Sequence, residues 1–509
     1  MASLARLSLS FGVLLCLAAC QRTEQSNVVR DWPVYGGDKA GSRFSALTQI
    51  TRENVSGLTK AWQFDLHEPG ESQTNPLVIG RTVYGYTPAL NVVALDGATG
   101  KQLWKFDAGN RRSGPQRGLV YWTDGKESRL FASAMNLLFA LDPATGKPIP
   151  TFGKDGSVDL REGLGSDNGG DFDRYFVSAT PPGILYKDLL IVGFRTSEAT
   201  PAPPGDVRAY DVHTGAVRWT FHTIPHPGEP GHETWPEDAW KRSGAANSWG
   251  GMALDEQRGI VYLPTGSAAT DFYGYDRLGD NLYANSLVAL EAATGRKLWH
   301  FQAVHHDLWD RDFPSPPSLL TVKRDGRSID AVALTSKQGL VYVFDRVTGT
   351  PLFPIEERPF PASDVPGEKT APTQPVPLAP EPFARQKLTE ELLKHVHLPL
   401  LVWEPAAGSG AMSAILKQRG EGASSPRCGF VRRPRYSLGL RHCAGRLSLA
   451  RAAESSVAAM GRFKALDHPE IRLNHRNDDQ LRDPVGDLFP FELVGAVGGD
   501  RDRHVLQRF

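Results

Sequence analysis

The chain has 509 residues, with 57 basic and 57 acidic side chains and a formal net charge of zero. This length suits one large β domain or two to three smaller ones, and the balanced charge gives no reason to expect a nucleic-acid partner. Residues 21–427 contain no cysteine, which excludes a cysteine-ligated metal site or a haem attached through Cys-x-x-Cys-His in that region and suits an oxidising compartment.

The chain begins with a predicted signal peptide, residues 1–19. A short apolar run ends in Leu17-Ala18-Ala19-Cys20, the pattern of a bacterial lipoprotein signal. We expect Cys20 to carry the lipid, residues 20–30 to form a tether, and Gln21 to favour the outer over the inner membrane. The predicted location is therefore the periplasm, with a lipid anchor in the outer membrane. The alternative is an ordinary cleaved signal that happens to contain Cys20.

An internal repeat follows along the first three hundred and fifty residues, and repeats of this kind identify the fold. Each copy has a half-buried strand, an Asp or Glu that begins a turn, a Gly that allows positive φ, and in three copies a Trp that can wedge between sheets. Unrelated hairpins are the alternative, but the shared spacing disfavours them. The four close copies and a weaker fifth are Val93-Ala-Leu-Asp-Gly-Ala-Thr-Gly100-Lys-Gln-Leu-Trp104, Phe139-Ala-Leu-Asp-Pro-Ala-Thr-Gly146, Arg208-Ala-Tyr-Asp-Val-His-Thr-Gly215-Ala-Val-Arg-Trp219, Val288-Ala-Leu-Glu-Ala-Ala-Thr-Gly295-Arg-Lys-Leu-Trp299 and Val343-Phe-Asp-Arg-Val-Thr-Gly349.

This repeat resembles the tryptophan-docking motif of quinoprotein dehydrogenases. The opening Asp31-Trp-Pro-Val-Tyr-Gly-Gly37 and the stretch His305-His-Asp-Leu-Trp-Asp-Arg-Asp-Phe-Pro-Ser-Pro-Pro317 resemble the membrane glucose and quinate dehydrogenase branch of that family. The resemblance implies an all-β, eight-bladed type of β-propeller over residues 31–394, with about five blades recognisable and the ring incomplete. It also implies pyrroloquinoline quinone as cofactor, with calcium or magnesium beside it.

The resemblance further assigns catalytic residues. Asp310 matches the general base that takes the alcohol proton; a turn aspartate is the structural alternative. Lys337, which we place at the start of a strand, matches the lysine that hydrogen-bonds the quinone oxygens. A solvated surface lysine is the alternative.

The predicted cofactor-binding residues are Arg117, Trp249, Ser178 and Thr180, together with Lys337. The Arg117 guanidinium would pair with a cofactor carboxylate, and the Trp249 indole, between small residues, would stack beneath the quinone. Ser178 and Thr180 would offer hydroxyls, although hydroxyl side chains before prolines are common.

Glu198 and Asp310 are the expected metal ligands, because hard carboxylate oxygen suits calcium. Ser267 stands where alcohol dehydrogenase relatives carry an asparagine ligand. His305 and His306 are adjacent and could be considered as a pair of metal ligands. We expect adjacent strand residues to point to opposite faces, however, so the two histidines should not share one ion. They are interpreted as scaffold for Asp310.

The resemblance ends near residue 395. Val402 to Gly420 resembles the first motif of an S-adenosylmethionine methyltransferase, without its partner motifs. Residues 421–460 contain arginine but no lysine, a composition that out-of-frame coding can produce. We therefore hypothesise that residues 395–509 are an unmatched tail that arose by fusion, frameshift or truncation.

Three functions are open at this point. The first is a dehydrogenase that oxidises a sugar, polyol or cyclic hydroxy acid and passes electrons to a respiratory quinone or cytochrome. The second is a non-catalytic propeller scaffold, which would have no need of Arg117, Asp310 and Lys337 in these contexts. The third is an inactive remnant, because an open ring leaves apolar blade faces uncovered.

Overall fold

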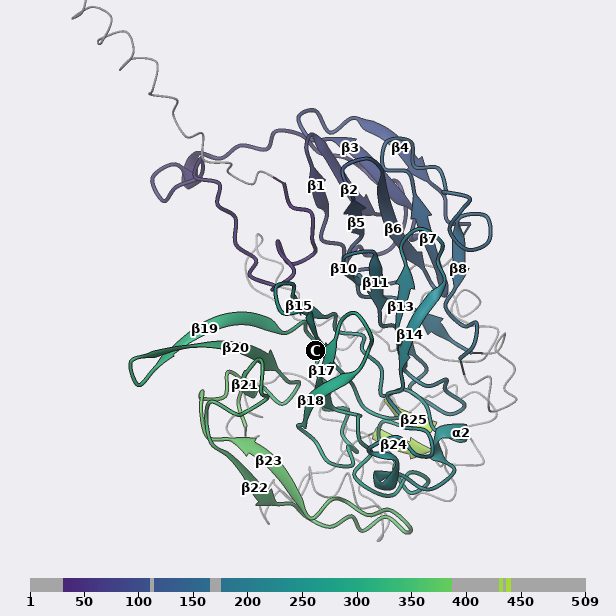
Figure 1. Ribbon diagram of the computed structural model, residues 1–509, viewed down its shortest axis with the longest axis vertical. Helices are drawn as coiled ribbons and strands as arrows, with labels where there is room; N and C mark the ends of the chain where they lie inside the picture. Colours follow the sequence, from purple (N-terminus) through teal and green to yellow (C-terminus); the bar gives the residue numbers. More distant parts are fainter. Residues whose placement is uncertain (1–30, 110–113, 165–174, 387–429, 434–435, 441–509) are drawn as a thin grey trace, which may run out of the picture.

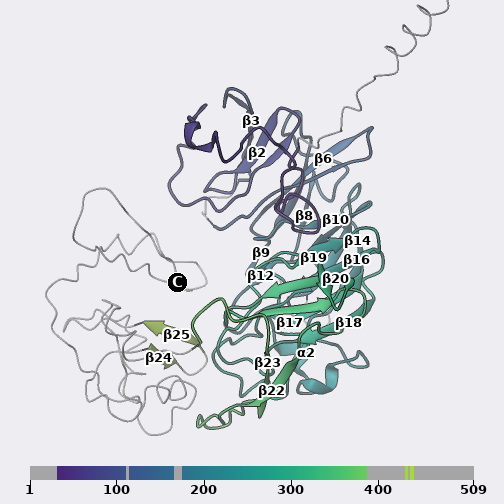
Figure 2. The ribbon, with the colours of Figure 1, turned by 90° about the vertical axis from the view of Figure 1, so that its left-hand side faces the viewer.

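The computed structural model describes residues 31–109, 114–164, 175–386, 430–433 and 436–440. Cys20 and the methyltransferase-like stretch 402–420 lie outside these residues. Within them the chain is almost entirely β-structure, and five antiparallel sheets, here blades 1 to 5, follow one another in chain order (Figures 1 and 2).

Four of these blades have four strands, and blade 5 has three. Blade 1 contains β1 (Leu77–Ile79), β2 (Thr82–Tyr86), β3 (Val92–Asp96) and β4 (Gln102–Phe106), and blade 2 contains β5 (Val120–Thr123), β6 (Ser128–Ala134), β7 (Leu137–Leu141) and β8 (Ser157–Asp159). Blade 3 contains β10 (Ile184–Tyr186), β11 (Leu189–Val192), β13 (Val207–Asp211) and β14 (Val217–Phe221), blade 4 contains β15 (Ala253–Asp255), β16 (Ile260–Pro264), β17 (Ser286–Glu291) and β18 (Lys297–Gln302), and blade 5 contains β19 (Ser318–Arg324), β20 (Arg327–Thr335) and β21 (Val341–Asp345).

The remaining described elements are short. They are the two-stranded pairs β9 (Val177–Ser178) with β12 (Arg195–Thr196), β22 (Ile355–Pro359) with β23 (Thr373–Pro377) and β24 (Phe430–Arg433) with β25 (Tyr436–Leu440), the 3-10 turns η1 (Val55–Gly57) and η4 (His232–Thr234), and the helix α2 (Ala239–Arg242). No helix among the described residues is long and apolar enough to cross a membrane.

The core lies between neighbouring blades rather than inside any one of them. One apolar cluster joins blades 2 and 3 through side chains such as Phe131 and Leu190, and another joins blades 3 and 4 through Ile191 and Val261. The first strands of successive blades touch, β5 with β10, β10 with β15 and β15 with β19. The first strand of each blade is therefore the innermost one, as in a propeller.

The predicted repeat begins in the third strand of each blade, and in blades 1, 3 and 4 its tryptophan, on the fourth strand, docks the blade on the next one. The indole Nε1 of Trp104, Trp219 and Trp299 donates to a carbonyl oxygen of the following repeat, at 3.0, 3.1 and 3.2 Å. The repeat glycine of the following blade faces the ring, so that a Cβ at Gly295 would lie 2.6 Å from Trp219. The φ of Gly295, +74°, also lies in the left-handed region that glycine tolerates. The propeller prediction is thus confirmed at the level of its repeat.

Two local predictions were wrong. Lys337 is not at the start of a strand, because β20 ends at Thr335 and Lys337 lies in the turn before β21. His305 and His306 follow β18 in a bend rather than a strand, where His306 has a φ of +45°. The two imidazoles still contact different groups, since His305 pairs with Gln302 at 2.8 Å and His306 with the Gly279 carbonyl oxygen at 2.7 Å.

Candidate active site

Four of the predicted site residues lie at equivalent places in the fold. Arg117, Thr180, Trp249 and Asp310 each lie in the loop that leads into the innermost strand of blades 2, 3, 4 and 5, respectively. Because these innermost strands adjoin, their preceding loops meet at one end of the propeller. Local backbone contacts tie the loops together, for the Arg117 amide donates to the Thr180 carbonyl oxygen at 3.0 Å.

Asp310, Lys337 and a third residue, Asp312, form the charged centre of this site. Lys337 Nζ donates to Asp310 Oδ1 at 2.6 Å and to Asp312 Oδ2 at 3.0 Å. The side chains of Asp310 and Lys337 are each 31% exposed, whereas that of Asp312 is 9% exposed. Asp310 also has a φ of +56°, a conformation uncommon for a residue other than glycine and often found at functional sites.

The two carboxyl groups have opposite pKa shifts. Burial and, after it, the neighbouring Asp312 carboxylate raise the pKa of Asp310 to about 8, although Lys337 acts to lower it. Burial also acts to raise the pKa of Asp312, but Lys337 and the hydrogen bonds from Ser267 outweigh it and lower that pKa. Asp312 is therefore the permanent anion of the pair, and Asp310 is the group that can gain and lose a proton near neutral pH.

Trp249 joins this centre to Arg117. Its indole Nε1 donates to Asp312 Oδ2 at 2.9 Å, and its backbone carbonyl accepts from Arg117 Nη1 at 2.7 Å. Arg117 Cζ lies 4.8 Å and Lys337 Nζ 5.4 Å from the centre of the indole ring. One half-buried aromatic surface thus carries two cations within about 6 Å, the range of cation–π contact.

Asp312 was missed in the sequence, although it stands two residues after Asp310. Its other oxygen accepts from the backbone amide of Ser267 at 2.6 Å and lies 2.9 Å from the Ser267 hydroxyl. A Cβ at Gly266 would lie 2.8 Å from the same oxygen, so the backbone can approach only because that residue is glycine. The repeated acid in Asp-x-Asp was the only signal, and spacing does not tell which carboxylate is buried.

The other predicted residues differ in how closely they approach the centre. The Thr180 hydroxyl is buried and has no hydrogen-bond partner among the described residues, so it could serve a ligand. Ser178 is buried and pairs with Arg195 in the β9–β12 ribbon. Glu198 is 59% exposed, and one of its carboxylate oxygens lies 3.6 Å from Arg195 Nη2.

A second unpredicted carboxyl, Asp271, lies within electrostatic reach of Glu198, Asp310 and Asp312. Burial raises its pKa well above the usual value, and those three acids raise it further. Hard carboxylate oxygens of this kind suit a divalent cation. Among the described residues, however, no three acidic, histidine or cysteine side chains are arranged to hold a metal ion.

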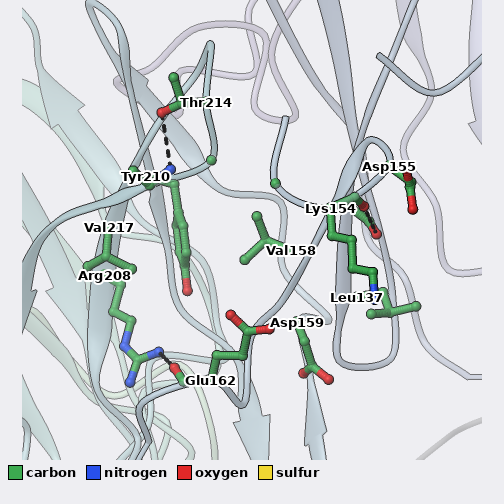
Figure 3. Close-up of a pocket in the computed structure, with 14 residues that line it drawn as sticks. Leu137, Lys154, Asp155, Val158, Asp159, Glu162, Arg208, Tyr210, Thr214 and Val217 are labelled. Carbon is green, nitrogen blue, oxygen red and sulfur yellow. Dashed lines mark hydrogen bonds between the residues drawn. The ribbon is translucent and has the colours of Figure 1, made fainter. Parts of the chain in front are cut away.

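A cavity of about 550 Å³ lies elsewhere, between blades 2 and 3 (Figure 3). None of the predicted site residues lines it. The outer strand β8 carries no tryptophan, and the repeat glycine Gly215 faces Val158 instead of an indole. Leu137, Val158 and Gly215 all line the cavity, which is therefore explained by the missing docking indole of blade 2.

Comparison with known proteins places the chain in one family. Residues 32–400 match the family model described as PQQ: Glucose/ethanol/alcohol dehydrogenase, beta-propeller domain. The chain is 36% identical over 396 residues to the quinate/shikimate dehydrogenase (quinone) of Acinetobacter baylyi, covering 71% of this chain and 48% of that protein. It is 33% identical over 407 residues to quinoprotein glucose dehydrogenase A of Acinetobacter calcoaceticus, covering 71% and 49%.

Solved structures agree on the fold. The quinohemoprotein alcohol dehydrogenase from Comamonas testosteroni superimposes with a TM-score of 0.57 at 26% identity, covering 72% of this chain and 55% of that one. The chain spans about half the length of the curated relatives it matches.

Proposed function

We propose, from the premise that this chain belongs to the family of PQQ-dependent dehydrogenase β-propellers, that it takes part in oxidising an alcohol group of a sugar, polyol or cyclic hydroxy acid. The named activities of its relatives, on quinate, shikimate and glucose, support this substrate class. The electrons would pass to a respiratory quinone or cytochrome. The matched region covers about half of each of these two relatives.

One observation carries the proposal: an acid, two cations and an indole from loops of different blades meet at one end of the propeller. Asp310 and Lys337 are in direct contact, and Lys337 and Arg117 both approach the Trp249 ring. A scaffold would need no such pairing, because the half-buried Arg117 guanidinium has no acidic partner among the described residues, and a buried charge is costly unless it is paired. This arrangement favours the enzyme over the scaffold.

The residues present fit pyrroloquinoline quinone in kind. A flat ring system can lie on the Trp249 indole, and Arg117 can bind one carboxylate bidentately. The unpartnered Thr180 hydroxyl and the third N–H of Lys337 remain available as donors. Ser178 would complete the wall of the site from the β9–β12 ribbon. When bound, the quinone supplies the acceptor for the hydride equivalent leaving the alcohol carbon.

The step that this chain's own residues perform is proton transfer. Asp310, once deprotonated, would accept the hydroxyl proton of the substrate. Lys337 would hold the carboxylate in place and, as a cation beside it, would stabilise negative charge on an oxygen. Asp312 would keep Lys337 charged, because although burial lowers the pKa of Lys337, the two carboxylates outweigh it and raise that pKa.

Calcium, or magnesium, is proposed to bind near Asp310 and Glu198, with Asp271 as a further oxygen donor. Four carboxyl groups, those of Asp271, Asp310, Asp312 and Glu198, interact there, and an additional cation would offset that charge. In the described residues these acids are not grouped for ligation, so the proton transfer rests on Asp310 and Lys337.

The chain is further proposed to be a periplasmic lipoprotein anchored through Cys20. The lipoprotein pattern before Cys20 supports this. Labelling cells with a palmitate analogue should mark the wild-type protein and leave a Cys20→Ser variant unmarked. Equal labelling of both proteins would rule out this anchor.

The function itself is tested by reconstitution. The chain is expressed, supplied with calcium and pyrroloquinoline quinone, and assayed for dye reduction with glucose, quinate and simple alcohols. The wild type should reduce dye with at least one of them, and Asp310→Asn should not. Cofactor binding without turnover would favour the inactive remnant, and no cofactor binding would favour the scaffold.

A further inference from the structure

Asp307 is a buried carboxyl group beside the candidate active site that the proton transfer does not use. It stands three residues before Asp310 and is 2% exposed. In the described part of the chain its carboxylate accepts four hydrogen bonds, and such bonds are what allow a charge to remain buried. They come from the Trp309 amide at 2.9 Å, the Arg311 amide at 2.6 Å, the Ser267 hydroxyl at 2.5 Å and Asn285 Nδ2 at 2.8 Å.

Two of these bonds fix the main chain on both sides of Asp310. Trp309 immediately precedes that residue and Arg311 immediately follows it, and both amides donate to the same carboxylate. The φ of Asp310 is +56°, a conformation that costs free energy in a residue other than glycine and persists where the surroundings impose it. The Asp307 carboxylate supplies that constraint from within the same loop.

A third bond connects Asp307 to Asp312 through Ser267. Ser267 Oγ lies 2.5 Å from Asp307 Oδ2 and 2.9 Å from Asp312 Oδ1. A hydroxyl carries one proton, so it can donate to only one of these two carboxylates at a time. Asn285 Nδ2 donates to the same Asp307 oxygen and to Ser267 Oγ, at 2.8 and 3.1 Å. All four side chains are buried, so a change at Asp307 reaches Asp312 through one closed polar network.

The network ties the site loop to blade 4. Ser267 and Asn285 lie in the connection between β16 and β17, whereas Asp307 follows β18. Arg277, in the same connection, donates through Nη2 to the carbonyl oxygens of Thr270 and Asp307, at 2.9 and 2.7 Å. Both the side chain and the main chain of Asp307 are therefore anchored to that connection.

We propose that Asp307 is a positioning residue, which holds Asp310 and Asp312 in the orientation that proton transfer needs. The inference rests on the proposed function. Lys337 Nζ occupies Asp310 Oδ1, so Oδ2 is the oxygen left to accept the hydroxyl proton of the substrate. The direction of Oδ2 depends on the Asp310 backbone, which Asp307 fixes. Asp307 thus acts through the loop and through Ser267, without contacting the substrate itself.

A matched carboxylate elsewhere in the chain separates this role from ordinary turn capping. Asp124 accepts from the amides of Lys126 and Glu127 at 2.8 and 2.9 Å, in the turn between β5 and β6. Asp124 follows β5 whereas Arg117 precedes that strand, so Asp124 lies at the other end of the propeller from the site. Asp124→Asn and Asp307→Asn therefore alter two capped turns, only one of which carries a site residue.

Amide hydrogen exchange on the full chain tests the geometry without cofactor or turnover. Asp307→Asn keeps the shape of the side chain, but its new N–H group faces donors that the carboxylate had accepted from. The amides of Trp309 and Arg311 should exchange about tenfold or more faster in this variant than in wild type. Asp124→Asn should leave both amides at the wild-type rate. Unchanged exchange in Asp307→Asn would overturn the proposal.

Steady-state kinetics of the reconstituted protein tests the positioning itself. Asp307→Asn should lower kcat by about tenfold or more, because a misdirected base reacts slowly. KM and the affinity for pyrroloquinoline quinone should stay within about twofold of the wild type, and Asp124→Asn should match the wild type throughout. An unchanged kcat, or a loss of cofactor affinity as large as the loss of kcat, would contradict a positioning role.

A milder variant decides the matter if Asp307→Asn does not fold. Ser267→Ala removes only the hydroxyl between Asp307 and Asp312 and leaves both loop amides bonded, so kcat should decrease about threefold or more while exchange at 309 and 311 stays unchanged. A wild-type kcat in Ser267→Ala would overturn the link to Asp312. If the wild-type protein itself reduces no dye, the proposed function fails, and the exchange measurement alone decides whether Asp307 holds the loop.

Discussion

At the scale of residues, the proton transfer depends on two neighbouring carboxyl groups that differ in burial and in pKa. Asp312 is buried and accepts hydrogen bonds from Trp249, Lys337 and Ser267, whereas Asp310 is partly exposed and, among the described residues, its carboxylate accepts from Lys337 alone. A permanent anion raises the pKa of the acid beside it. The geometry thus separates a fixed charge from a group that can exchange a proton.

The first prediction concerns Asp310. Because its pKa is raised to about 8, it is protonated at neutral pH and becomes a base only as the pH passes that value. Dye reduction by the reconstituted protein should therefore increase between about pH 7 and 9 and then level off. Asp310→Asn should lower kcat by about a hundredfold or more at every pH; a variant that keeps its rate would refute the assignment.

The second prediction concerns Asp312. Asp312→Asn removes the neighbouring negative charge, so the pKa of Asp310 should fall and the pH–rate profile should move to lower pH. The same change weakens the support of Trp249 and Lys337, and cofactor affinity should decrease by about tenfold. Asp65→Asn, at an exposed acid far along the chain, is the control. An unmoved pH profile would mean that Asp312 does not act on Asp310.

Part of the candidate site could be predicted from the sequence, and part could not. Asp310, Lys337, Arg117 and Trp249 were found through the family resemblance, and the structure brings them together. Asp312 and Asp271 could not be found, because their importance lies in burial and in contacts across the chain. His305 and His306 were placed in a strand from local sequence, but the chain bends after β18, and neighbouring loops decide that bend.

At the scale of elements, the repeat turn and the docking tryptophan hold adjacent blades together. Trp219 is 8% exposed and lies in the cluster between blades 3 and 4. Such a contact was predictable, since both the Trp and the Gly are fixed in sequence spacing. The absence of an indole in blade 2 was also visible in the sequence, but the cavity that results was not.

The third prediction uses a matched pair of glycines with the same φ of +74°. Gly295 faces the Trp219 ring, whereas nothing lies within 4 Å of a Cβ at Gly326. Gly326→Ala should cost about 1–2 kcal/mol of unfolding free energy from the left-handed backbone alone. Gly295→Ala should cost about 1–3 kcal/mol more, because the methyl group meets the indole.

Urea unfolding followed by circular dichroism measures both variants. The difference between them isolates the docking contact from the backbone strain. Equal losses of stability would mean that the indole moves aside without penalty and that the docking contact contributes little.

At the scale of the whole molecule, the loops that lead into the innermost strands of four successive blades supply the site. This explains why residues as far apart in sequence as Arg117 and Asp310 can act together. It also places the site at an end of the ring that further blades would border. The candidate active site is thus a consequence of the repeat that builds the blades.

The most direct measurement is the affinity of pyrroloquinoline quinone for the full chain in the presence of calcium, by isothermal titration calorimetry. Wild type is compared with Arg117→Ala, with Trp249→Ala and with Arg81→Ala, whose side chain is 80% exposed and serves as control. One cofactor should bind per chain, the first two variants should bind about tenfold or more weakly, and the control should match wild type. Absent binding, or equal binding by all four proteins, would contradict a cofactor site built on Arg117 and Trp249.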